Sequence, residues 1–157
     1  RTVLRDSADQ IRALHPSRSV RIEISVVDDS IELPDTNIDV SRMDQVFRNL
    51  LENSVSACPD PVEIGIECAA TKREHEAMIQ VRFRDNGPGL SIDCRRHVFE
   101  PFYTTRPKGT GLGMAIARRI VEAHGGTIDA VASEENSGAE FLIELPVGHV
   151  SDTSDLP

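Results

Sequence analysis

The chain has 157 residues, of which 39% are hydrophobic and 27% are charged, and its formal net charge is −9. This size and composition are typical of one globular domain with a substantial core, and the negative charge argues against a nucleic-acid interface. No apolar run approaches the ~18 residues that could cross a bilayer, and no secretory signal is present, so we expect a cytoplasmic domain without direct membrane contact.

The predicted elements mix helices and strands without a strict βαβ alternation. In chain order the patterns first predict a helix over 2–14, a strand over 21–27, short extended pieces over 31–40 and a helix from the capping residue Ser41 to about Ala57. Strands over 61–68 and 77–85 then form a hairpin around a charged loop, and a short helix over 91–100, capped by Ser91, follows them. The chain continues with a helix over 111–124, ended by Gly125 and Gly126, and with strands over 126–132 and 139–146 joined by a polar turn. We therefore expect an α/β fold, a two-layer sandwich of a mixed sheet with helices on one face, over residues 1–148. Residues 149–157 are expected to form a flexible tail or linker.

The cysteine and histidine residues predict no metal centre. Cys58, Cys68 and Cys94 contain no CxxC pair, which favours ordinary thiols in a reducing compartment. The five histidines show neither an HExxH motif nor the spacing of a Cys/His site.

The segment KGTGLG, residues 108–113, places three glycines directly before a predicted helix. Such a junction presents backbone N–H groups to an anion. The Walker pattern GxxxxGK[ST] does not occur, and the dinucleotide pattern GxGxxG would need glycine where Met114 stands. Taken alone, the motif fits an anion site and a helix start softened by glycine about equally well.

Two further motifs lie upstream. In DNGPGL, residues 85–90, a carboxylate at a strand end precedes two glycines and can face a flat ligand, although an ordinary charged turn is the commoner explanation. In NLLENS, residues 49–54, Asn49 and Asn53 are separated by only ~40° around a helix. Their amide oxygens can help to hold a hydrated Mg²⁺, or they can simply be solvated or bond a neighbouring helix. Glu52 is expected to be exposed, on the side opposite the apolar stripe.

The segment VFEPFYTT, residues 98–105, holds three of the six aromatic residues of the chain, which has five Phe and one Tyr. It is either a hydrophobic plug under a loop or the hinge of a lid over a ligand.

The four motifs occur in one order, and the set resembles the N, G1, F and G2 boxes of the sensor histidine kinases. Their superfamily also holds gyrase, the heat-shock chaperones of this fold and the MutL-type repair ATPases. The resemblance covers about residues 44–146, and the compact segment TTRPKGTGLG looks most like the nitrogen-regulation type of sensor kinase. It implies a Bergerat-type ATP-binding fold.

The resemblance also implies roles for single residues. Asn53, assisted by Asn49, would coordinate Mg²⁺, and Asp85 would accept a hydrogen bond from the amino group of adenine. Glycines would let the backbone approach the base at Gly87 and Gly89 and would wrap the phosphates at Gly109, Gly111 and Gly113. The other candidates for contact with ATP, in the lid or in the apolar lining, are Ile92, Phe99, Phe102, Thr105, Thr110 and Leu112.

The chain departs from the usual motifs at positions that carry positive charge. Many relatives have Lys and an aromatic residue where Ser56 and Ala57 stand, and many have Arg where Thr104 stands. Arg106 and Lys108 in the lid are the best substitutes for these cations, although ordinary solvated loop charges remain the alternative. Many relatives also start the last strand with Gly-Thr, and the pair Gly138-Ala139 lacks that hydroxyl.

No histidine has the context of a phosphoacceptor, since His15 is followed directly by Pro16. We therefore expect the ATP-binding catalytic domain of a histidine kinase, cut from a longer protein that begins before Arg1 and that a membrane anchor could hold. It would transfer the γ-phosphate to a histidine on a separate helical dimerisation domain, and through that domain reach a response regulator. The alternatives are an anti-sigma-type serine kinase, an ATP-driven conformational module, which would generally carry Glu at Asn49, and a nucleotide-binding scaffold without catalysis.

Overall fold

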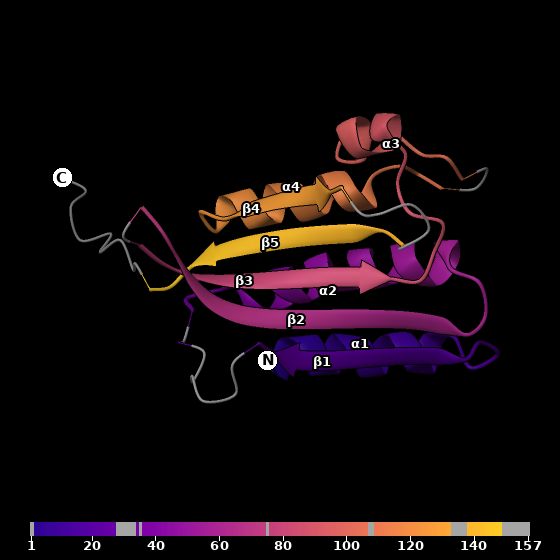
Figure 1. Cartoon of the computed structure of the whole chain (residues 1–157), viewed down its shortest axis with the longest axis horizontal. Coiled ribbons are helices and arrows are strands. Elements are labelled where there is room, and N and C mark those ends of the chain that lie inside the picture. The colour runs from indigo at the N-terminus through magenta and orange to yellow at the C-terminus, as the bar shows by residue number, and fades with distance from the viewer. Residues whose placement is uncertain are drawn as a thin grey trace.

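The computed structural model describes residues 2–27, 34, 36–74, 76–106, 109–132 and 138–148. Within them the chain forms four helices and five strands (Figure 1), which are α1 Thr2–Leu14, β1 Val20–Val26, α2 Val40–Ala57, β2 Val62–Arg73, β3 Glu76–Asp85, α3 Ile92–His97, α4 Gly113–Ala123, β4 Thr127–Val131 and β5 Glu140–Pro146. None of the helices in this described part has the length and hydropathy that crossing a membrane requires.

The strands form one mixed sheet in the order β1-β2-β3-β5-β4. The β1–β2 pair is parallel and the other three pairs are antiparallel. Helices α1, α2 and α4 cover one face of this sheet, whereas α3 lies beyond its edge, next to α4 (Figure 1). The expected two-layer α/β sandwich is therefore confirmed.

The core lies between the helices and the sheet, with α2 at its centre. Along β2 the side chains alternate, so that those on one face are buried and those on the other are exposed. Helix α2 packs against both α1 and α4, and it buries the apolar stripe Met43, Val46, Phe47, Leu50, Leu51 and Val55. Because α2 is held on three sides, the polar residues beside its stripe are fixed in direction.

Several element boundaries differ from the prediction. Helix α2 begins one residue before Ser41, and Asp39 is the capping residue, because its carboxylate accepts the N–H of Arg42 at 3.0 Å. Ser41 lies inside the first turn and only donates its hydroxyl to Asp39. The predicted charged loop between β2 and β3 is shorter than expected, since the strands pair as far as Arg73 and Glu76.

The remaining differences concern helix ends. Helix α3 ends at His97, before the predicted Glu100, and α4 begins at Gly113, because Gly111 has a φ of +67° that an α-helix does not use. The predicted turn after residue 132, the tail 149–157 and much of the stretch 31–40 lie outside the described residues.

Candidate functional site

A cavity of about 500 Å³ opens where α2, the end of β3 and the two glycine loops meet. It brings together most of the residues that the motifs predicted, namely Asn49, Asn53, Asp85, Gly89, Thr105, Arg106, Gly109, Thr110, Gly111 and Gly113. These residues come from three separate stretches of the chain, 49–53, 85–89 and 105–113, so motifs that are distant in the sequence form one site in space.

Asp85, the last residue of β3, has a carboxylate that is buried in the cavity wall with only 6% of the residue exposed. Its Oδ1 accepts the N–H of Gly87 at 3.0 Å and the N–H of Ala139 at 2.9 Å. Its Oδ2 accepts the hydroxyl of Ser54 at 2.7 Å. Oδ2 therefore accepts one N–H or O–H donor fewer than Oδ1, and it is the oxygen that can accept a donor in the cavity.

The backbone around Asp85 leaves no room for side chains. At Gly138, where φ is +83°, a Cβ would lie 1.6 Å from the carbonyl oxygen of Asp85. At Gly87 a Cβ would lie 3.0 Å from Oδ1 of Asp85 and 3.2 Å from Sγ of Cys58. The strand β5 and the loop after β3 therefore approach this carboxylate as closely as only glycine permits.

The thiol of Cys58 lies beside this carboxylate. Burial of the thiol, and then the negative charge of Asp85, raise the pKa of Cys58 to about 12. The thiol is therefore neutral at physiological pH and adds no second negative charge behind the cavity.

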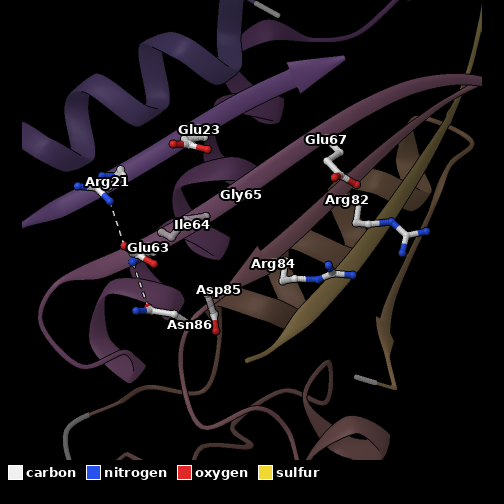
Figure 2. Close-up of a pocket in the computed structure, with 10 residues that line it drawn as sticks. All are labelled: Arg21, Glu23, Glu63, Ile64, Gly65, Glu67, Arg82, Arg84, Asp85 and Asn86. Atoms are coloured by element: carbon white, nitrogen blue, oxygen red, sulfur yellow. Dashed lines mark hydrogen bonds and ion pairs between the residues drawn. The ribbon is translucent and has the colours of Figure 1, made fainter. Parts of the chain in front are cut away.

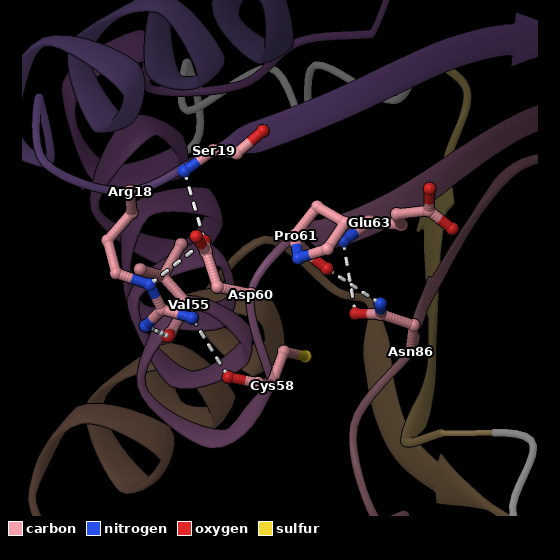
Figure 3. A network of polar contacts seen from close by, with 8 residues as sticks. All are labelled: Arg18, Ser19, Val55, Cys58, Asp60, Pro61, Glu63 and Asn86. Atoms are coloured by element: carbon pink, nitrogen blue, oxygen red, sulfur yellow. Dashed lines mark hydrogen bonds and ion pairs between the residues drawn. The ribbon is translucent and has the colours of Figure 1, made fainter.

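A polar network supports the base of this wall (Figure 3). Asn86 donates to the carbonyl of Pro61 at 2.9 Å and accepts the N–H of Glu63 at 3.0 Å, which fixes the residue after Asp85 to the start of β2. Arg18 donates to the carbonyls of Val55 and Cys58 at 2.7 and 3.0 Å, so it caps the C-terminal end of α2. The connection between α1 and β1 thus holds the end of α2 in place.

Asn49 and Asn53 lie at the other end of the cavity, one turn apart on α2. The side-chain amide of Asn49 donates to the carbonyl of Gly113 at 2.8 Å, which leaves its Oδ1 as an acceptor. The carbonyl of Asn53 accepts Nη2 of Arg106 at 2.7 Å, so the lid cation lies against α2. No group of three or more His, Cys, Asp and Glu side chains that could hold a metal occurs within the described residues. The side-chain amide oxygens of Asn49 and Asn53 fit Mg²⁺, with oxygens of a ligand and of water completing its coordination.

Glu52 also lines the cavity, although the helical wheel predicted that it points away. Its Oε2 lies 3.1 Å from Nε2 of His15, at the end of α1, and 40% of its side chain is exposed. Glu52 thus contacts α1 and also borders the cavity, and a helical wheel represents neither tertiary contact.

The second glycine loop is attached to the aromatic segment. The carbonyl of Gly111 accepts the N–H of Phe102 at 3.0 Å, and a Cβ at Gly111 would lie 2.4 Å from the backbone carbon of Phe102. Both residues have positive φ, +67° and +68°. Gly111 is therefore required for this contact, whereas Lys108 lies outside the described residues.

Five of the predicted contact residues lie outside the cavity lining. Gly87 supports Asp85 from behind, Ile92 and Phe102 are 64% and 75% exposed, and Leu112 precedes the first turn of α4. Phe99 packs edge-on against Phe141, with the guanidinium carbon of Arg118 5.4 Å from its ring centre. The helix start at Gly113 and the short α3 direct these side chains elsewhere.

Several residues that the structure brings to the site were not named as individual contact residues in the prediction. The lining also includes Leu90, Cys94, Val98, Tyr103, Met114, Ala139 and Phe141. Ser54 was missed as well, although it directly follows Asn53 and its burial beside Asp85 depends on the pairing of α2 with the sheet.

A smaller hollow of about 330 Å³ lies on the face of the sheet that the helices leave open (Figure 2). Gly65 has no side chain to fill it, and charged side chains of both signs surround it. Beside it, Arg82 and Arg84 form ion pairs with the buried Glu140 at 2.6 and 2.8 Å, which anchors the first residue of β5. Asp85 also lines this hollow, but neither the second glycine loop, residues 109–113, nor Asn49 and Asn53 do.

Comparison with known proteins identifies relatives of this chain. Residues 38–149 match the family described as histidine kinase-, DNA gyrase B-, and HSP90-like ATPase. Sporulation kinase E of Bacillus subtilis is 34% identical over 92% of the chain and 19% of its own length. Sensor histidine kinase ZraS of Escherichia coli K12 is 37% identical over 83% of the chain and 26% of its own length. The chain thus spans about a fifth to a quarter of the length of these curated relatives.

Solved structures of histidine kinases are also similar to this chain. The catalytic domain of the histidine kinase ThkA superimposes with a TM-score of 0.77 at 25% identity, over 93% of this chain and 91% of that one. Full-length ShkA in complex with AMPPNP gives a TM-score of 0.74 at 30% identity, over 92% of this chain and 29% of that one.

Proposed function

Because the chain belongs to the family of histidine kinase-, DNA gyrase B- and HSP90-like ATPases, we propose that it binds Mg-ATP and presents the γ-phosphate to a histidine. It corresponds to the catalytic ATP-binding domain of the sensor histidine kinases. The acceptor histidine belongs to a helical dimerisation domain of the parent protein, from which a response regulator takes the phosphoryl group. We assign the domain to the cytoplasm and, from its compact lid, to the nitrogen-regulation type.

The observation that carries this proposal is the carboxylate of Asp85. Two N–H groups and one hydroxyl hold it in the cavity wall, and one acceptor position remains on Oδ2. The exocyclic amine of adenine is a donor that matches this position. Guanine carries an acceptor oxygen at the same carbon, so a carboxylate disfavours it.

The phosphates fit the opposite end of the cavity. The backbone amides at Gly111 and Gly113 and the N-terminal end of α4 favour negative charge. The N–H of Gly109 donates to the carbonyl of Arg106 at 3.2 Å, so Gly109 contributes by letting the loop approach the phosphates. Arg106 adds a cation next to Asn53, and we propose that Lys108 adds a second. Asn49 and Asn53 would hold Mg²⁺, which supplies neutralisation of the phosphate charge when it is bound.

Phosphoryl transfer needs positioning and charge neutralisation more than it needs a nucleophile from this domain. At position 49, where relatives that hydrolyse ATP generally carry Glu, the amide of Asn49 cannot activate water. Its nitrogen is also committed to the carbonyl of Gly113. These features favour transfer to a protein acceptor over an ATP-driven conformational cycle, and we expect slow ATP hydrolysis.

Calorimetric titration of the chain with ATP, with and without Mg²⁺, tests the binding. Asp85→Ala should abolish binding, while Asp129→Ala, at an exposed position of β4, should leave it unchanged. Asn53→Ala should remove the dependence on Mg²⁺. Full affinity in the Asp85→Ala variant would contradict the proposed adenine contact.

The transfer step requires the parent protein with its helical domain. Incubation with ATP labelled at the γ-phosphate should give a phosphoprotein that is labile in acid and stable in base, as phosphohistidine is. An acid-stable product would instead indicate a serine kinase of the anti-sigma type.

A further inference from the structure

We propose that Ser54 is a positioning residue that fixes Oδ2 of Asp85 and thereby sets the preference of the site for adenine over other purines. Ser54 lies on α2 directly after Asn53 and is only 7% exposed. It is absent from the cavity lining, so it acts through Asp85 and not by touching the base. The inference rests on the proposed function, because it assumes that Asp85 accepts the amino group of adenine.

The two oxygens of Asp85 are held differently. Oδ1 accepts two backbone N–H groups, from Gly87 and Ala139, which fill its acceptor positions. Within the described residues, Ser54 is the one hydroxyl or N–H donor to Oδ2, at 2.7 Å. Oδ2 is therefore the oxygen with a position left for a ligand, and the Ser54 hydroxyl determines where that position points.

The hydroxyl of Ser54 behaves unlike that of Ser56 on the same helix. Ser56 donates to the carbonyl of Glu52, four residues earlier, which is the usual local bond of a serine inside a helix. Ser54 instead donates across the helix–sheet interface to Asp85. Its side chain thus serves the carboxylate and not the helix.

The start of β5 cannot supply this hydroxyl. Many relatives have Gly-Thr where this chain has Gly138-Ala139. Ala139 has no hydroxyl, and it donates only its backbone N–H to Asp85. The hydroxyl beside the carboxylate comes from α2 instead. Since Ser54 adjoins Asn53, the helix that carries the proposed metal ligand also orients the base-binding oxygen.

The test compares ADP with purine ribonucleoside diphosphate, which lacks the amino group, by calorimetry on the whole chain. The wild-type chain should prefer ADP by roughly tenfold or more, because the amino group bonds a charged acceptor. Ser54→Ala should weaken ADP binding by about five- to thirtyfold and leave the purine nucleotide within about twofold, so the preference collapses. Alanine suits a helix interior, and the thermal unfolding midpoint of each variant checks that the fold is retained.

Ser56→Ala is the matched control, because it removes a hydroxyl from the same helix without touching Asp85, and it should retain the full preference. Equal losses for both nucleotides in Ser54→Ala, or no loss for either, would overturn the positioning role while leaving the proposed function intact. A wild-type chain that does not bind ADP would overturn the proposed function and this inference together.

Discussion

The replacement Gly138→Ala should lower the free energy of unfolding by more than the strain of a left-handed residue alone, because the site leaves no space for a Cβ there. Gly138 has a φ of +83°, and an added Cβ would lie 1.6 Å from the backbone oxygen of Asp85. No rotation of a side chain can relieve this overlap, because both partners are backbone. Glu140, two residues on, is anchored by two ion pairs, so the start of β5 resists displacement.

The expected cost follows from what must break. A non-glycine residue at positive φ costs about 1–2 kcal/mol. Moving Ala139 away from Asp85 loses one hydrogen bond to a charged group, about 1.5–3 kcal/mol, and one between backbone groups, about 0.5–1.5 kcal/mol. The free energy of unfolding should therefore fall by about 3 to 6 kcal/mol, a large share of the 5–15 kcal/mol typical of a domain.

Gly125→Ala is the matched control, since φ is +72° there and an added Cβ would lie 3.5 Å from its nearest neighbour, in Pro146. Only the strain of about 1–2 kcal/mol should appear. Urea denaturation measures both variants, and calorimetry with ADP should show binding lost in Gly138→Ala alone. Equal destabilisation of the two variants, with ADP affinity unchanged in Gly138→Ala, would refute the reasoning.

Three further predictions concern the same cavity. Gly111→Ala should weaken ATP binding at least about tenfold, because the added Cβ would overlap the backbone of Phe102. Gly113→Ala should keep the fold, because its added Cβ would lie 3.5 Å from Asn49. A calorimetric titration with ATP compares the two variants. Burial and the charge of Asp85 raise the pKa of Cys58 from its ordinary value of 9.0 to about 12 in the folded chain, so stability is complete below pH 9 and falls as the pH rises toward 12, by at most about 1.4 kcal/mol per pH unit. Denaturation at pH 8 to 10.5 should show this slope, and Cys58→Ala should reduce it. Cys94 lines the cavity, so ADP should slow its alkylation, measured by mass spectrometry; an unchanged rate would contradict nucleotide binding there.

The sequence predicted the layers of the fold and most of the cavity lining, because each depends on local patterns. The apolar stripe of α2 and the alternation in β2 determine which faces are buried, and the glycine motifs mark close approaches of the backbone. Asp39 was missed as the helix cap because Ser41 offers an equally good local signal.

What the sequence could not predict depends on contacts between distant segments. The burial of Ser54 beside Asp85 joins residues 31 positions apart, and the contact between Glu52 and His15 of α1 joins residues 37 positions apart. Ile92 and Phe102 were predicted as apolar lining from their residue type, yet both are exposed. Ile92 begins the short helix α3, and the backbone of Phe102 packs against Gly111.

The polar network at the end of α2 has a consequence for where this domain can be cut. The family match starts at residue 38, yet Arg18 binds the last carbonyls of α2, and Leu4, Ile11 and Ile22 belong to the core. A fragment that began at residue 38 would lose the edge strand β1 and expose the apolar sides of α2 and β2 to water. The segment that holds the Asp85 end of the cavity in shape is thus encoded before the segment by which the family is identified.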